Sequence, residues 1–213
     1  MTVAEPQDLV ARLLENAGTT YADEAGITLK NTPKPLFQLL VLCMLASKPI
    51  DAQIATAAAR ELFHAGLRTP VAVLDADRAT MIKAFGRASY ARYDESSATR
   101  LTQMATTVRD EYAGDLRNLA ARGENDVEAV EKLLKGFTGI GDTGAHIFLR
   151  EVQDVWRWVR PFFDDRALHA AADLGLPTRP EDLGGLAPQN NAALAAALVR
   201  VSLNNELKKL VKE

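Results

Sequence analysis

Hydrophobic residues recur along this chain every three or four positions with polar residues between them, which is the pattern of amphipathic helices. Nearly every residue from 36 to 46 is apolar, so this segment is predicted to be a buried helix at the centre of a bundle. Further helices are predicted over residues 7–16, 52–64, 127–135, 143–152, 168–174 and 190 to about 211, and from Asp94 or Ser96 to about Tyr112. Residues 21–35 and 177–188 contain several prolines and glycines and are predicted to be loops.

Capping residues support these helices. Asp51 and Asp77 each stand just before a predicted helix, where a side-chain oxygen accepts a hydrogen bond from a free backbone N–H. Thr69 is followed by Pro70, a residue that favours the first helical position. Alanine and leucine dominate the composition and β-branched runs are short, so the fold is expected to be all-α.

Length and composition indicate how many domains the chain can form and in which compartment it is expected. With 213 residues, of which 47% are hydrophobic, the chain is long enough for one or two globular domains. No apolar run reaches the roughly 18 residues of a membrane helix, and the first residues lack the features of a signal peptide. The single Cys43 lies in an apolar run and is expected to be buried and reduced, so a cytoplasmic location without membrane association is predicted.

Residues 133–148 are the most informative stretch, because two amphipathic segments meet there at a turn with glycines at 139, 141 and 144. Glycine accepts positive φ and lets a partner approach the backbone. The second helix starts inside the turn, so its first N–H groups offer a site for an anion such as a DNA phosphate. Ile140 is expected to point back into the core. A helical corner with glycine caps and no ligand is the alternative.

A second feature follows downstream, where Asp164 and Asp165 stand at the start of a predicted helix after the apolar pair Phe162-Phe163. The turn resembles a helix-hairpin-helix motif, and the two features together resemble the helix-hairpin-helix DNA glycosylases of the endonuclease III superfamily. Counting back from Leu174-Gly175 places Asp164 at the family's catalytic position. Whether Asp164 or Asp165 is the catalytic acid stays open, since Asp164 is also suited to cap the helix. Asp165 is expected to be the better cap or an ion-pair partner of Arg166.

The resemblance implies a two-domain helical fold. One domain would span residues 35–154 and carry the hairpin motif at 133–150. Residues 1–34 and 155–213 would together form the second domain. The implied function is DNA repair by base excision, in which a monofunctional DNA glycosylase hydrolyses the N-glycosidic bond of a damaged or mispaired base. Damaged double-stranded DNA is the implied partner, and the protein is expected to be a monomer.

The sequence lacks two features of many family members, and it shows no metal site. Thr143 occupies the position of the lysine that forms a Schiff base in bifunctional members, so no lyase activity is expected. One cysteine cannot hold an iron–sulfur cluster, which needs about four thiolates. His64, His146 and His169 share no ligand spacing, so neither a metal nor another cofactor is expected.

Candidate DNA contacts follow from the resemblance and from local composition. Gly139, Gly141, Thr143 and Gly144 would bind backbone phosphate, with Lys48 as a wedge or phosphate contact and Arg87 and Arg92 as further contacts. Tyr93, Trp156 and Trp158 would line a base pocket. The alternatives are a solvated loop lysine for Lys48, an ordinary loop for residues 86–94, and core packing for the two tryptophans.

A second hypothesis keeps the scaffold and drops the catalysis. The formal net charge is −3, whereas DNA affinity depends largely on phosphate contacts made by cations. Asp142 places a carboxylate beside the proposed phosphate site. These features favour a catalytically inactive, glycosylase-like protein that binds DNA or another partner.

Overall fold

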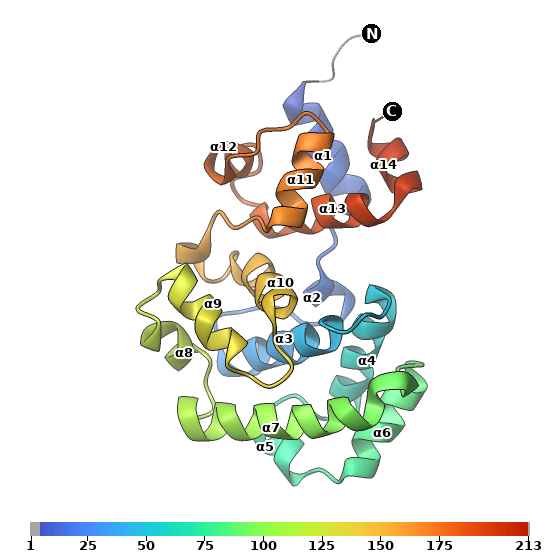
Figure 1. Cartoon of the computed structure of the whole chain (residues 1–213), viewed down its shortest axis with the longest axis vertical. Helices are drawn as coiled ribbons and strands as arrows, with labels where there is room; N and C mark the ends of the chain where they lie inside the picture. The colour runs from blue at the N-terminus through green and yellow to red at the C-terminus, as the bar shows by residue number, and fades with distance from the viewer. Residues whose placement is uncertain (1–4, 213) are drawn as a thin grey trace. The chain divides into compact units, whose positions relative to one another are not determined.

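The computed structural model describes residues 5–212, and the regular structure within this range is entirely helical (Figure 1). The predicted all-α class is therefore confirmed. None of the helices in this range is both long and apolar enough to cross a membrane.

The chain divides into two compact units. The central unit, residues 21–148, contains α2 (Tyr21–Glu24), α3 (Pro33–Ala46), α4 (Ala52–His64), α5 (Pro70–Asp75), α6 (Arg78–Arg87), the 3-10 turn η1 (Ala91–Tyr93), α7 (Asp94–Tyr112), α8 (Arg117–Arg122) and α9 (Val127–Lys135). The terminal unit consists of two segments, which within the described part of the chain are residues 5–20 and 149–212. It contains α1 (Pro6–Ala17), η2 (Arg157–Val159), α11 (Asp165–Asp173), α12 (Pro180–Gly185), α13 (Asn191–Leu203) and α14 (Asn205–Lys212). The boundary near residue 148 falls inside α10 (Asp142–Val152).

The boundaries between the two units differ from the predicted domain boundaries. The sequence places the divisions near residues 35 and 154, whereas the chain divides after Thr20 and after Phe148. Residues 21–34 belong to the central unit because α2 packs against α3 and α4.

The helix α3 is the core of the central unit. All residues from Pro35 to Leu45 are buried, and every hydrophobic side chain from Leu36 to Leu45 is fully so. A helix that is apolar on every side must be covered on every side. It packs against α4 and α7, and α7 in turn packs against α5 and α6 (Figure 1).

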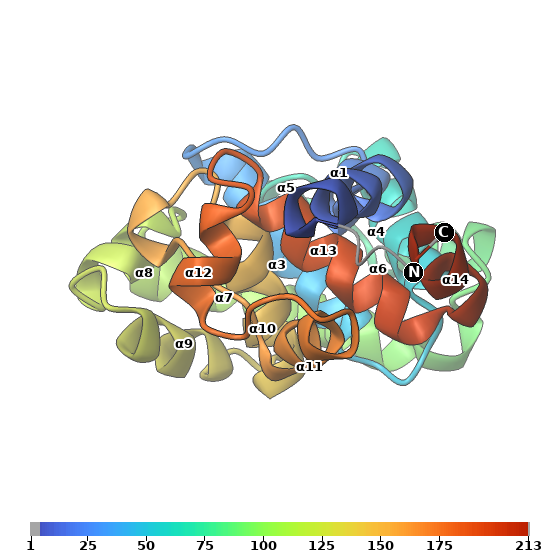
Figure 2. The ribbon, with the colours of Figure 1, turned by 90° about the horizontal axis from the view of Figure 1, so that it is seen from above.

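The core of the terminal unit is built on α13. Both α1 and α11 pack against this helix, and α14 folds back against α1 (Figure 2). Leu13, Leu194 and Leu198 are fully buried there. The alanine-rich segment of α13 allows its neighbours to approach closely, because a methyl group occupies little space.

Most local predictions hold, and three do not. Asp51, Thr69 and Asp77 cap their helices as expected, accepting hydrogen bonds from Gln53 N, Ala72 N and Thr80 N. The two predicted loops contain the short helices α2 and α12. The predicted single helix over 190–211 is wrong, because the chain becomes extended at Asn204. The Asn204 carboxamide accepts hydrogen bonds from Glu206 N and Leu207 N, so α14 starts anew.

Candidate functional site

The glycine turn joins α9 to α10 as the sequence predicts. Asp126 caps α9 by accepting a hydrogen bond of 2.8 Å from Ala129 N. Gly139 adopts a φ of +97°, in the region that favours glycine. Ile140 is 5% exposed, so it does point into the core. The turn is therefore anchored from below by an apolar side chain.

Two of the glycines are needed for packing. A Cβ at Gly139 would lie 2.9 Å from Arg100 Cδ and 3.3 Å from Met44 Cγ. A Cβ at Gly144 would collide with Ser47 Oγ. These contacts seat the turn against the C-terminal end of α3 and against α7. Gly139 and Gly144 therefore face the protein at close range.

The other two hairpin candidates face outward. Gly141 is exposed, and no atom outside the turn lies within 4 Å of the position of a Cβ there. Thr143 is also exposed. The backbone at Gly141 and the start of α10 are thus the parts of the hairpin that an approaching phosphate can reach.

Asp142 is paired within the hairpin. Its carboxylate is 77% exposed, lies in the first turn of α10 and accepts a hydrogen bond of 2.9 Å from Lys135 Nζ. Lys135 also contacts Glu131 at 2.8 Å, and His146 Nε2 lies 3.5 Å from the same Glu131 oxygen. The Lys135 ammonium holds the pKa of Asp142 below its usual 3.8. The hairpin carboxylate is therefore charged at neutral pH and partly compensated by Lys135.

A basic and aromatic cluster lies at the same end of α3. Lys48 Nζ lies 5.6 Å from the centre of the Tyr93 ring, and Arg92 Cζ lies 5.2 Å from it. Both distances suit cation–π contact. The Tyr93 ring also packs against Tyr90, at 6.1 Å between centroids. Three candidate residues that are up to 45 positions apart in sequence are thus brought together.

Buried Tyr90 holds this cluster to the core. Its hydroxyl lies 3.3 Å from Leu45 O and 3.3 Å from Ser97 Oγ. Burial raises the pKa of Tyr90, so the hydroxyl stays neutral and can donate. Because Leu45 belongs to α3 and Ser97 to α7, Tyr90 ties η1 to both helices.

The turn and the cluster share the end of α3. Met44 and Ser47 pack beneath Gly139 and Gly144, and Lys48 follows directly. Arg100 adds a partly exposed cation whose stem packs on Gly139. Nothing in the sequence marks Arg100 as a candidate, since it is one of many polar residues in α7. Within residues 5–212, Lys48, Arg92 and Arg100 form no ion pair.

Arg87 does not join this cluster. Its guanidinium forms an ion pair with Glu61 of α4, and this hydrogen bond lowers the pKa of Glu61. The positive charge of Arg87 is therefore compensated within the protein, which weakens its candidacy as a phosphate contact.

Asp164 in the terminal unit combines two structural tasks. Its Oδ1 accepts a hydrogen bond of 2.9 Å from Ala167 N, which caps α11. Its Oδ2 pairs with Arg150 Nη1, and the two side chains are 8% and 4% exposed. The expectation that Asp165 is the cap or pairs with Arg166 is wrong. Asp165 is exposed in the first turn of α11, because Asp164 is the residue with the extended backbone that a cap requires.

Gln153 positions the segment that leads to Asp164. Its amide is fully buried, donates to Phe162 O at 3.0 Å and accepts from Phe162 N at 2.9 Å. It also donates to Arg150 O at 3.0 Å. One side chain thus links the Arg150 backbone to the segment entering α11, and no local pattern in the sequence singles it out.

The two tryptophans pack against each other. Their rings stack at 5.4 Å with an angle of 21°, and Trp156 is 2% exposed while Trp158 is partly exposed. Trp156 therefore contributes to packing in this structure, in line with the alternative considered for it.

Comparison with protein-family models, curated proteins and solved structures gives no match. Among residues 5–212 there is also no group of three or more His, Cys, Asp and Glu residues that could hold a metal ion. The geometry of the hairpin, the basic cluster and Asp164, together with the motif resemblance, is therefore what indicates a function.

The Arg150–Asp164 pair generates a stability prediction. Arg150→Met should lower the free energy of unfolding by about 3–5 kcal/mol, because a buried carboxylate is left without its partner. Urea unfolding followed by circular dichroism measures this change. Lys208→Met is the matched control, since it breaks the more exposed pair with Asp173, and it should cost far less. Equal destabilisation in the two variants would show that Arg150 and Asp164 are not coupled.

Proposed function

We propose that this chain binds double-stranded DNA through the hairpin turn and the adjoining basic cluster, and acts as a monofunctional DNA glycosylase of the endonuclease III type. The observation that carries the proposal is the placement of Lys48 and Arg92 around Tyr93 at the end of α3 on which the Gly-Ile-Gly turn is seated. In this proposal the helix-hairpin-helix motif and the basic cluster contact the same duplex.

The chemistry of these groups suits a phosphate backbone. Lysine and arginine neutralise phosphates and release counterions, and the exposed backbone at Gly141 adds N–H donors at a helix start. Arg100 extends the positive surface along α7.

The net charge of −3 does not oppose DNA binding, because binding depends on the local field. Several carboxylates are offset by partners of their own, as Glu95 is by Arg78 and Glu61 by Arg87. The cations around Tyr93 form no such ion pairs within residues 5–212. A weakly acidic protein can therefore present a positive surface at this end of α3.

Tyr93 and Lys48 support recognition of a disturbed duplex. An aromatic ring beside cations offers a stacking platform for a base. Lys48 lies on the short connection between α3 and α4, and the resemblance places a wedge residue there. Such a residue would fill the space left when a base is extruded.

Asp164 is the proposed catalytic carboxylate. Cleavage of the bond between the base and C1′ of the sugar passes through an oxocarbenium-like state, which a carboxylate stabilises. The base leaves with the electron pair of the C1′–N bond, and a water adds to C1′. One proton of that water passes to the departing base, so the products are the free base and an abasic sugar. Thr143 has no amine, so a Schiff base at this position is excluded and hydrolysis is the proposed outcome.

The second candidate is a DNA-binding protein without this catalysis. It is favoured by one observation, that both oxygens of Asp164 already have partners in Ala167 N and Arg150. One carboxylate can cap a helix and also act in catalysis. The Asp164 oxygen that pairs with Arg150, however, would have to contact the sugar as well.

DNA binding should depend steeply on salt. Binding to a duplex carrying an abasic-site analogue, measured by fluorescence anisotropy over a series of salt concentrations, should be tighter than to undamaged duplex. Lys48→Ala, Arg92→Ala and Arg100→Ala should each reduce the slope of log K against log salt by about 1 for each phosphate that the variant no longer neutralises.

Lys83→Ala is the matched control for these variants, because Lys83 is an exposed lysine on α6. Its slope should equal that of the wild type. Absence of DNA binding even at low salt would overturn both candidate functions.

Asp142→Asn should strengthen DNA binding. The change removes a carboxylate from the start of α10 and frees Lys135 from one of its two partners. Affinity for duplex should rise severalfold at low salt, and the gain should shrink as salt increases, since the effect is electrostatic. Unchanged affinity would indicate that DNA does not approach this side of the turn.

Asp164→Asn separates the two candidates. Asparagine also caps helices, so α11 should still form. The variant loses the ion pair with Arg150 and should melt at a lower temperature, so thermal unfolding checks that it is folded at the assay temperature. A glycosylase would show base release slower by about 100-fold or more while DNA affinity persists. The readout is base release from duplexes carrying a panel of damaged or mispaired bases. No base release by the wild type from any duplex, with DNA binding intact, would favour the second candidate.

A further inference from the structure

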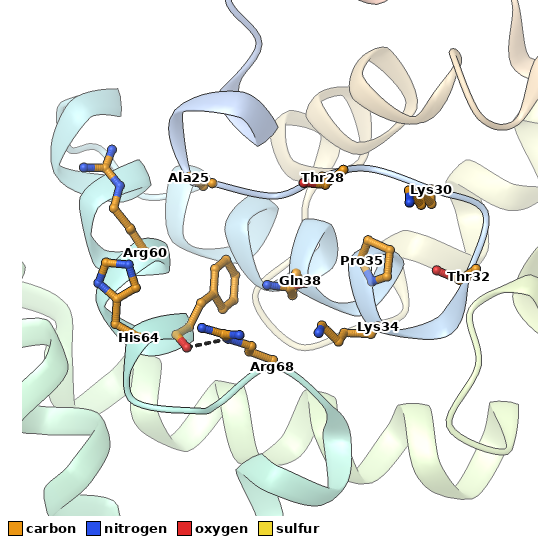
Figure 3. A pocket seen from close by; sticks show the side chains of 12 residues that line it. Ala25, Thr28, Lys30, Thr32, Lys34, Pro35, Gln38, Arg60, His64 and Arg68 are labelled. Carbon is orange, nitrogen blue, oxygen red and sulfur yellow. Dashed lines mark hydrogen bonds between the residues drawn. The ribbon is translucent and has the colours of Figure 1, made fainter.

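A cationic cavity lies elsewhere in the central unit, at the N-terminal end of α3 (Figure 3). Its volume is about 560 Å³, within the range typical of small-molecule sites. Lys30 and Lys34 line one side of it, while Arg60, His64 and Arg68 from α4 and the following loop line the other (Figure 3). No motif in the sequence marks these residues as a binding site.

No lysine or arginine that lines this cavity forms an ion pair within residues 5–212. Arg60 donates to the main-chain oxygen of Glu24, at 3.2 Å from Nε and 2.5 Å from Nη2. Arg68 Nε donates to the main-chain oxygen of Phe63 at 2.7 Å. Within residues 5–212, Lys30 and Lys34 make no ion pair. Four permanent cations therefore face one cavity while retaining their charge.

No acidic side chain is found among the described residues that line the cavity. Outside the lining, the Glu61 carboxylate lies 3.8 Å from His64 Nδ1. Its hydrogen bond with Arg87 lowers its pKa most, and the nearby charges of His64 and Arg60 lower it further.

Gln38 of α3 adds a polar group at the floor. It is 7% exposed, and Figure 3 shows its amide between the lysine side and the arginine side. Among the described residues its side chain has no hydrogen-bond partner. Buried amides are normally hydrogen-bonded, so this amide is available to donate to a ligand oxygen.

We propose that this cavity binds a small anion that carries two or more phosphoryl groups. The arginines offer one phosphoryl group the guanidinium N–H donors that are not used by Glu24 O and Phe63 O, and the lysines offer point charges for another. Two separated groups of cations favour a ligand with two anionic centres over a single phosphate. This inference goes beyond the proposed DNA function and does not depend on it.

Isothermal titration calorimetry of the 213-residue chain with pyrophosphate at low salt tests the proposal. Pyrophosphate should bind in a 1:1 complex and more tightly than orthophosphate. Lys30→Gln with Lys34→Gln should weaken binding by about tenfold or more, because charge-assisted hydrogen bonds are removed. These two lysines are exposed and unpaired among the described residues, so the fold should not be disturbed.

Gln38→Leu is a second variant, which removes the amide and keeps the approximate shape. It should also weaken pyrophosphate binding severalfold. The control is Lys83→Gln with Lys132→Gln, which makes the same change in charge at exposed sites outside the cavity and should leave binding unchanged.

Two results would overturn the proposal. The first is absence of pyrophosphate binding, or binding that is equal in all variants. The second is weaker duplex DNA affinity in the Lys30→Gln, Lys34→Gln variant without any pyrophosphate binding, which would assign these cations to DNA. Failure of the DNA proposal would leave the pyrophosphate result unaffected.

Discussion

The burial of α3 is the constraint on which the central unit depends. Because residues 35–45 are buried on every side, α4, α7 and the hairpin are required to cover this helix. Polar residues with candidate binding roles lie near both ends of this helix. Lys48 follows the C-terminal end beside the hairpin, and Lys34 and Gln38 lie toward the N-terminal end in the cationic cavity. A single hydrophobic helix thus places two separate groups of candidate binding residues.

The Arg150–Asp164 pair shows how a proposed catalytic group can also be part of the architecture. The carboxylate starts α11 through Ala167 N and receives a buried guanidinium from α10, while Gln153 holds the intervening segment. Buried ion pairs of this kind impose a defined geometry on the groups that share them. An oxygen of Asp164 that served a sugar would do so from a position that is already fixed.

The sequence by itself determined the helices with strong local signals. The apolar run of α3, the capping by Asp51, Thr69 and Asp77, and the glycine turn at 139–144 all depend on residues within a few positions of one another. The prediction of a single helix over residues 190–211 is wrong at Asn204. The side chain of this residue caps a new helix, and the preceding helix ends. The choice of Asp164 over Asp165 as the cap depended on one backbone conformation that spacing does not reveal.

Only the tertiary structure decided which side chains meet. Lys48 and Tyr93 are 45 positions apart, and Arg100 of α7 reaches Gly139 in the hairpin turn. These contacts depend on how helices pack, and helical periodicity shows which face is buried without showing what lies against it. For the same reason the sequence does not predict the roles of Arg150 and Gln153. A buried polar residue cannot be told from an exposed one by sequence until its partner is known.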